Sequence, residues 1–257
     1  MRTRPSDFEK RWRQRFAEFA RLHDDDAGVA GWSPSGLQTR FRFFTSRWGG
    51  ARRNALYLDV GCGAGTYSRW LADAGLQVIG VDYSPPALVK ARLRDAIRVT
   101  YCAADASRLP FPDASVDGIL CFGVLQAVQH SGPFVAEAAR VLKPGGEFWI
   151  DALNATGPLA LWDQGRRRLQ RKPMHLRYES PRKLMTTLSR AGFGEISRHW
   201  LLMMPGRLRA LQPLCDSRPL QWLLRALPLL GAISSHSFLI RCVRTGTNDK
   251  PDGDVTL

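Results

Sequence analysis

The sequence predicts an α/β protein with a mostly parallel β-sheet that helices cover on both faces. Three observations lead to this fold class. Short apolar runs typical of buried strands alternate with helical stretches from residue 56 onward. A glycine-rich turn follows the first of these runs. Because a parallel connection requires a crossover, usually a helix, this alternation favours parallel pairing.

The expected strands are short, apolar and bounded by turn residues or helical stretches. Five lie in the central region and two follow it: 56–60, 77–82, 97–102, 116–122, 147–151, 195–203 and 237–244. A helix is expected over 180–191, because Pro181 favours its first turn and Gly192 its end. The segment Lys143-Pro144-Gly145-Gly146 is expected to form the turn before the fifth strand.

Helices are also expected before the first strand. Four aromatic residues recur at steps of four, four and three within residues 6–22: Phe8, Trp12, Phe16 and Phe19. This spacing predicts an amphipathic helix, and a second helix is expected from Leu37 toward Trp48. The chain then divides into three parts: a helical extension or lid over 1–53, a domain over 54–245 with a basic insert at about 154–178, and a tail over 246–257 whose polar composition predicts disorder.

The net charge of +14 lies on the two flanks of the chain. Residues 1–53 carry +6, residues 54–150 carry −1 and residues 151–257 carry +9. A basic surface is typical of proteins that bind nucleic acid, acidic small molecules or anionic membranes. The alternative is an arginine-rich, solvated surface with no ligand.

Several classes of protein are disfavoured. The five cysteines form no Cys-x-x-Cys pair, which argues against a disulfide scaffold or zinc ribbon and favours a reducing, cytoplasmic location. No His/Asp cluster has the spacing of metal ligands, so no metal is expected. The N-terminal residues lack the apolar stretch of a signal peptide, and the longest uncharged C-terminal run, Ala226 to Ile240, is too short and broken to span a membrane.

The clearest chemical signal follows the first strand, in the segment Asp59-Val60-Gly61-Cys62-Gly63-Ala64-Gly65-Thr66. Glycines let a ligand approach the backbone, and the following helix offers free N–H donors. Dinucleotide-binding turns have glycine at the first, third and sixth positions. Counted from Gly61, the sixth position is Thr66, so this spacing is not met. Asp82 ends the second strand and can accept both ribose hydroxyls, while Asp105 follows the third and can accept from an adenine amino group. The sequence therefore predicts a nucleoside site at the carboxyl ends of the strands.

Four segments in order carry a family resemblance: LDVGCGAGTYSRWLA, VIGVDYS, AADASRLPFPDASVDGILC and EAARVLKPGGEFWID. They resemble the class I S-adenosylmethionine-dependent methyltransferases with a type 11 domain, in the branch that includes ubiquinone/menaquinone C-methyltransferases and many small-molecule enzymes. The resemblance covers residues 55–151 strongly and 178–244 weakly. It implies a Rossmann-like, doubly wound sheet of seven mostly parallel strands, S-adenosyl-L-methionine as cofactor, and methyl transfer (EC 2.1.1.-).

The resemblance also implies nine cofactor-binding residues. They are Asp59, Gly61 and Gly63 at the methionine end, Asp82 at the ribose, Tyr83 on the adenine, Asp105 and Ala106 at the adenine edge, and Cys121 and Phe122 near the sulfonium. One position departs from the family pattern. Many relatives have a His where this chain has Ala127, two positions after Leu125.

A general base is needed only when the methyl acceptor is a hydroxyl or an acidic carbon. The candidate catalytic residues are His130, Asp151 and Tyr67, with His175 as a further candidate base. Each of these residues also has a purely structural explanation.

The acceptor is less constrained than the cofactor. No Asn-Pro-Pro-Tyr-like segment follows the fourth strand, which disfavours methylation of exocyclic amino groups of bases. Basic residues between Arg166 and Arg177 can bind a phosphate or carboxylate. The aromatic N-terminal helix and the leucine-rich stretch 208–230 either contact an anionic membrane surface, which fits a lipophilic or quinone-like acceptor, or pack on the fold.

These observations favour a methyltransferase that acts on a small-molecule acceptor. The basic charge keeps RNA (tRNA) methylation open as an alternative. Ala127 and the lack of a clear base keep a non-catalytic cofactor-binding or interaction module open as another.

Overall fold

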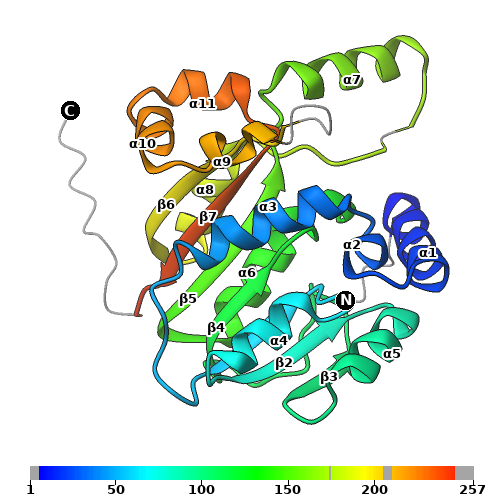
Figure 1. The fold of residues 1–257 in the computed structure, drawn as a ribbon, viewed down its shortest axis with the longest axis vertical. Coiled ribbons are helices and arrows are strands. Elements are labelled where there is room, and N and C mark those ends of the chain that lie inside the picture. Colours follow the sequence, from blue (N-terminus) through cyan, green and yellow to red (C-terminus); the bar gives the residue numbers. More distant parts are fainter. Residues whose placement is uncertain (1–5, 174, 205–209, 247–257) are drawn as a thin grey trace.

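The computed structural model describes residues 6–173, 175–204 and 210–246, and shows one seven-stranded sheet (Figure 1). The strand order is β3-β2-β1-β4-β5-β7-β6. The strands are β1 (Leu56–Val60), β2 (Gln77–Asp82), β3 (Val99–Ala103), β4 (Val116–Cys121), β5 (Leu142–Leu153), β6 (Phe193–Leu201) and β7 (Ser237–Arg244). Strand β7 runs antiparallel to β5 and β6, while β1 to β5 pair in parallel. The predicted seven-stranded, mostly parallel sheet is confirmed.

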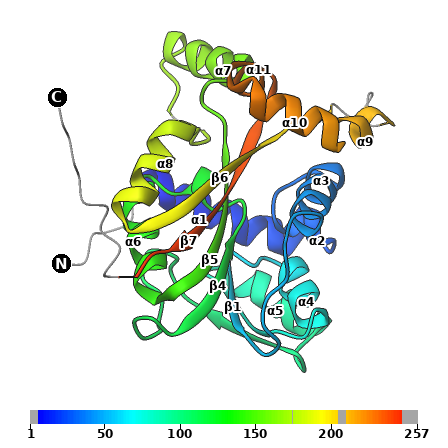
Figure 2. The ribbon, with the colours of Figure 1, turned by 90° about the vertical axis from the view of Figure 1, so that its left-hand side faces the viewer.

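Helices cover both faces of this sheet. The helices are α1 (Asp7–Leu22), α2 (Asp26–Val29), α3 (Pro34–Thr45), α4 (Thr66–Asp73), α5 (Pro85–Arg94), α6 (Ser131–Val141), α7 (Pro158–Leu169), α8 (Pro181–Arg190), α9 (Gln212–Cys215), α10 (Arg218–Ala226) and α11 (Pro228–Ser234), with a short 3₁₀ turn over Leu125–Ala127. Seen from the side, α3 and α4 lie on one face of the sheet and α6 and α8 on the other (Figure 2).

Two apolar cores follow from the alternation of side chains along each strand. On one face, Tyr57 and Trp149 pack with α3, α4 and α5. On the other, Leu58 and Phe148 pack with α6 and α8. Adjacent residues of the same strand thus enter opposite cores, which is why these strands are nearly continuously apolar.

The helix boundaries follow local capping chemistry. At α1, the Ser6 hydroxyl accepts from the Glu9 N–H and the Glu9 carboxylate accepts from the Ser6 N–H, which completes a capping box. At α8, Ser180 is the N-cap and Pro181 the first helical residue. The predicted helices at these two places are confirmed.

The predicted turn before the fifth strand is corrected. Helix α6 ends at Val141 and β5 begins at once with Leu142. Leu142 pairs with Val116, but the next pairing joins Glu147 to Gly118. Lys143–Gly146 are therefore extra residues that bulge out within β5, and Gly145 supplies the positive φ of +80° that this bulge uses.

The N-terminal helices lie against the remainder of the fold. Phe8 and Trp12 of α1 are buried and pack with Ala127, so this aromatic face is not free to contact a membrane. Phe43 and Phe44 of α3 are almost fully buried in the core on its side of the sheet. Within the expected basic insert, residues 158–169 form α7. Apart from Gly246, the expected disordered tail lies outside the described residues.

In the part of the chain that the structure describes, no helix combines the length and the apolar character that crossing a bilayer requires.

Gly118 offers a test of the packing between β1 and β4. A Cβ atom at this position would lie 2.2 Å from the Tyr57 ring, which the buried core holds in place. We expect Gly118→Ala to lower the free energy of unfolding by about 1–3 kcal/mol, as overpacking does. Urea denaturation measures this change. The matched control is Gly132→Ala in the first turn of α6, where a Cβ atom meets nothing within 4 Å; equal losses in both variants would contradict the explanation.

Candidate functional site

The carboxylate of Asp82 organises the carboxyl end of β2. Its Oδ2 accepts from the Gly63 N–H at 3.0 Å, and its Oδ1 accepts from the Ser84 N–H at 2.8 Å. Burial raises the pKa of Asp82, while these backbone hydrogen bonds act in the opposite direction. The contact brings the end of β2 against the glycine-rich turn after β1, as the sequence predicted from Asp82 and Gly63.

Backbone hydrogen bonds hold the glycine turn against the end of β2. The Gly61 and Cys62 N–H groups both donate to the Val81 carbonyl, at 2.7 and 3.1 Å. Gly61 has a φ of +78°, and a Cβ there would lie 2.3 Å from the Val124 side chain. Gly63 has a φ of +52°, but a Cβ there would meet nothing within 4 Å. Gly63 therefore borders open space in which a ligand can approach its backbone.

Asp59 lies beneath this turn and is buried. Its carboxylate accepts from the Ser68 hydroxyl at 2.6 Å. Burial raises the pKa of Asp59 to about 6, and the hydrogen bonds from Ser68 only partly oppose this rise. Asp59 thus ties β1 to the first turns of α4.

Helix α1 covers the ends of β2 and β3. The Arg13 guanidinium pairs with the Asp105 carboxylate and lies 5.3 Å from the centre of the Tyr83 ring. The Phe16 ring meets Tyr83 edge-on at 6.3 Å. Burial opposes ionisation of Asp105, but the hydrogen bonds from Ser107 and the nearby Arg13 outweigh it and lower the pKa of Asp105. Ala106 is half-buried beside the core.

The end of β4 is part of an aromatic cluster. Cys121 is fully buried, and the Phe122 ring packs edge-on against Tyr67 at 4.8 Å and Phe44 at 5.4 Å. The Tyr67 hydroxyl is buried without a hydrogen-bond partner, and this burial raises the pKa of Tyr67 well above its usual value. In this arrangement the Phe122 and Tyr67 side chains serve the core between α3 and α4.

Asp151 forms a buried ion pair that no pattern in the sequence predicts. Its Oδ2 accepts from Arg40 Nε at 2.8 Å, and its Oδ1 accepts from the Gly123 N–H at 2.6 Å. The Arg40 guanidinium also lies 4.4 Å from the centre of the Trp32 ring. Trp32 occupies the space beside Gly123, where a Cβ would lie 2.4 Å from its ring. One carboxylate thus joins α3 to the ends of β4 and β5.

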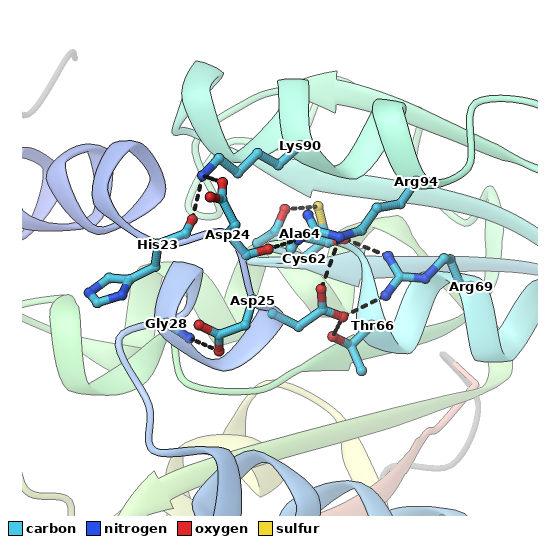
Figure 3. Close-up of polar contacts among 12 residues, drawn as sticks. His23, Asp24, Asp25, Gly28, Cys62, Ala64, Thr66, Arg69, Lys90 and Arg94 are labelled. Atoms are coloured by element: carbon cyan, nitrogen blue, oxygen red, sulfur yellow. Dashed lines mark hydrogen bonds and ion pairs between the residues drawn. The ribbon is translucent and has the colours of Figure 1, made fainter.

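Charged groups join the start of α2 and the residues before it to α4, which follows the glycine turn, and to α5 (Figure 3). Asp26 accepts from the Thr66 hydroxyl and from Arg69, and Arg94 lies 3.2 Å from the same carboxylate. Lys90 of α5 pairs with Asp24 at 2.8 Å and also donates to the His23 carbonyl.

The two histidine candidates lie at the start of α6 and against α1. His130 is exposed and forms the N-cap of α6 without a side-chain capping bond. His175 lies against α1, where its carbonyl accepts from the Trp12 indole at 3.1 Å. Burial and then Arg15 lower the pKa of His175. The catalytic assignments of His130, Asp151 and Tyr67 stay predictions.

Comparison with known proteins bears on this site. A profile described as a methyltransferase domain matches residues 58–150. Residues 58–150 form a class I S-adenosylmethionine-dependent methyltransferase domain. The cofactor class is therefore S-adenosylmethionine.

The relatives of this methyltransferase domain are enzymes of several kinds. One, 35% identical over 136 residues (53% of this chain and 51% of the relative), is named a probable S-adenosylmethionine-dependent methyltransferase of Mycolicibacterium smegmatis. Another, 33% identical over 153 residues (58% and 60%), is a ubiquinone biosynthesis O-methyltransferase of Burkholderia orbicola. The chain thus spans about half the length of the curated relatives it matches. 

A solved structure shares the fold of the methyltransferase domain. It is phosphoethanolamine N-methyltransferase 2 of Haemonchus contortus in complex with phosphomonomethylethanolamine and S-adenosylhomocysteine. The TM-score is 0.62 at 20% identity, over 90% of this chain and 61% of that one.

One part of the methyltransferase domain offers groups that suit its cofactor. The Asp82 carboxylate lies against the Gly63 N–H beside open space, and a carboxylate there can accept from the ribose hydroxyls of an adenosine. Sequence reasoning found Asp82 and Asp105 but missed Arg13 and Arg40. Their partners lie 92 and 111 residues away along the chain, and no local pattern signals such a contact.

Asp59 predicts a pH dependence of stability. Because its pKa is about 6 in the fold and near 3.8 when exposed, its protonated form contributes stability that is present below pH 4 and lost as pH rises through 6. We expect wild type to lose about 2 kcal/mol relative to Asp59→Asn between pH 4 and pH 7. Urea unfolding of both proteins across this range measures the difference. A constant difference would contradict the shifted pKa.

The buried pair of Asp151 with Arg40 predicts a large loss of stability when one of the two charges is removed. In Asp151→Asn the buried Arg40 keeps its charge without a partner, so we expect a loss of about 3 kcal/mol in the free energy of unfolding. The control is Asp113→Asn, which alters an exposed pair with Arg140. Chemical denaturation compares the two. A loss below about 1 kcal/mol at Asp151, the range of surface pairs, would show that the pair is not held in a buried setting.

Proposed function

We propose that this protein is an S-adenosylmethionine-dependent methyltransferase whose acceptor is a small molecule with a lipophilic, quinone-like or anionic part. The observation that carries the proposal is the junction of Asp82 with the Gly63 N–H beside open space. When bound, the cofactor supplies an electrophilic methyl group on a positively charged sulfur. The work of the protein is then to position the two reactants and exclude water.

The chain's own residues suit this positioning role. Asp82 keeps acceptor capacity for ribose hydroxyls after its two backbone bonds, because a carboxylate has about four lone-pair sites. Tyr83 offers a ring face, and Asp105 an acceptor for an amino group. Asp151 fixes the Gly123 backbone at the end of β4, so we assign it a positioning role between α3 and the strand ends.

We also propose that α1 acts as a lid. Its Arg13 and Phe16 contact the two residues assigned to adenine, Asp105 and Tyr83. Its Phe8 and Trp12 pack on Ala127. The larger histidine that many relatives have at this position would occupy part of the space that these two rings fill. The small Ala127 and the aromatic helix thus suit one another, and the proposal needs no base at this position.

The acceptor class is supported by the relatives and by the region after β5. The Burkholderia orbicola relative is named for ubiquinone biosynthesis, which supports a quinone-like ring. Basic residues of α7, Arg166 to Arg168, can pair with an acidic group on the acceptor.

Binding of S-adenosylhomocysteine tests the cofactor assignment. We expect Asp82→Ala to weaken binding about 100-fold, because two hydrogen bonds to a charged acceptor together contribute about 3 kcal/mol. Titration calorimetry measures the affinity. Asp73→Ala, which removes an exposed carboxylate of α4, should bind as wild type does. Absence of binding to the wild-type protein would overturn the cofactor assignment.

Transfer from labelled cofactor into fractionated cell extract tests the acceptor class. We expect label in the lipid or small-molecule fraction. Label in RNA would overturn the small-molecule proposal in favour of nucleic acid. The net charge of +14 is the observation that favours this alternative. Binding of cofactor without transfer to any fraction would favour a non-catalytic module.

A further inference from the structure

One end of the molecule exposes an unusual amount of apolar surface. Of the fifteen large apolar side chains that the described residues expose, eleven lie between residues 161 and 233. Four of the strongly exposed ones are Leu169 (87%), Leu229 (79%), Trp222 (69%) and Trp162 (63%). They come from α7, α10 and α11, which lie at the same end of the molecule in both views (Figures 1 and 2). Soluble monomers rarely leave large apolar patches open to water.

Helix α7 contributes one side of this surface. Among its described side chains only that of Ala160 is buried. Trp162, Arg166 and Leu169 follow one another at steps of four and three, so they share one face of the helix. The Arg166 guanidinium lies 4.9 Å from the centre of the Trp162 ring. Helices that lie in a membrane interface carry exposed Trp and Leu, and the long Arg side chain can reach from among them to the lipid phosphates.

Helices α10 and α11 contribute the other side. In α10, Gln221 and Leu224 face inward while Trp222 is exposed. In α11, Leu229 and Ile233 are exposed on successive turns. The start of α7 is tied to α11, since Asn154 and Thr156 both donate to the Ala232 carbonyl. The segment before α7 therefore contacts α11, and we call the exposed apolar side chains of α7, α10 and α11 the apolar end.

The stretch of sequence that contains the apolar end is strongly positive. Residues 158–236 contain 14 Arg and Lys but only four Asp and Glu, a net charge of +10 out of the +14 of the whole chain. The part from 217 to 236 contains no acidic residue. A basic rim around exposed leucine and tryptophan complements a surface that is apolar inside and anionic outside.

A groove beside α11 has the same character. It has a volume of about 940 Å³ and lies between α8, β6 and α11, with Met185, Ile196, Trp200 and Leu229 among its lining residues. Three cations also line it: Arg182, Arg190 and Arg198. None of the three forms an ion pair with a carboxylate in the described part of the chain. Arg198 lies 4.3 Å from the centre of the Trp200 ring, and its Nε is buried without a hydrogen-bond partner.

We propose that the apolar end docks on the surface of an anionic lipid bilayer. The exposed Trp and Leu side chains of α7, α10 and α11 would enter the interface, and the surrounding arginines would meet lipid phosphates. This inference goes beyond the proposed methyl transfer and does not depend on it. Docking through this end would bring the region after β5 to the membrane, where a lipophilic molecule resides.

Sedimentation with vesicles tests the proposal without cofactor. The full chain is mixed with vesicles of phosphatidylcholine alone or with one third phosphatidylglycerol. We expect binding to the anionic vesicles only, and a loss of at least tenfold in the double variant Trp222→Ser/Leu229→Ser. The matched control is Leu93→Ser/Ile97→Ser, which changes two side chains that are 83% and 97% exposed but belong to the region of α5 and β3. The control should bind as wild type does.

Four outcomes would overturn docking on a bilayer. One is no sedimentation with anionic vesicles. Another is an equal loss of binding in both double variants. The third is a self-associated protein, seen by sedimentation velocity, that becomes a monomer in Trp222→Ser/Leu229→Ser, which would assign the surface to a second copy of the chain. Binding of an RNA duplex that displaces the vesicles and is insensitive to the apolar substitutions would assign the basic rim to nucleic acid and also count against the bilayer. Circular dichroism shows whether each variant is folded, and calorimetry with S-adenosylhomocysteine tests the methyltransferase proposal separately.

Discussion

The carboxylate of Asp151 is the constraint on which the arrangement of the strand ends depends. It holds Arg40 of α3 on one oxygen and the Gly123 N–H on the other. Both charged side chains are almost fully buried, so neither can exchange its partner for water at low cost. This pair therefore fixes α3, the last helix of the N-terminal extension, relative to β4 and β5.

The glycine turn and the N-terminal extension depend on one another. The turn is held by the Val81 carbonyl and the Asp82 carboxylate, while Asp26 of α2 reaches Thr66 and Arg69 at the start of α4. The extension is thus part of the wall of the candidate cofactor site and also a brace for the turn that would contact the cofactor. The aromatic face of α1 accordingly packs against the remainder of the fold.

Most of the sheet could be predicted from the sequence, because its strands are largely apolar runs set between turn residues and helices. Residues 56–60, 77–82 and 237–244 were predicted with the bounds that β1, β2 and β7 have. The junction of Gly63 with Asp82 was also predictable, since parallel strands end at one edge. The bulge at Lys143–Gly146 was not, because Pro-Gly-Gly favours a turn and only pairing with β4 shows that the strand continues around it. Arg40 and Asp151 could not be paired from sequence, because an arginine in an amphipathic helix normally faces water.

The position of α1 affects how a cofactor would enter and leave the candidate site. If adenine takes the Asp105 carboxylate, Arg13 must first leave it, and the aromatic side chains beside Tyr83 must shift with the helix. The pair is half-exposed, so breaking it costs little, but the buried Trp12 must move too. Exchange of spent for fresh cofactor would then be timed by helix displacement, and turnover would be slower than the chemical step itself.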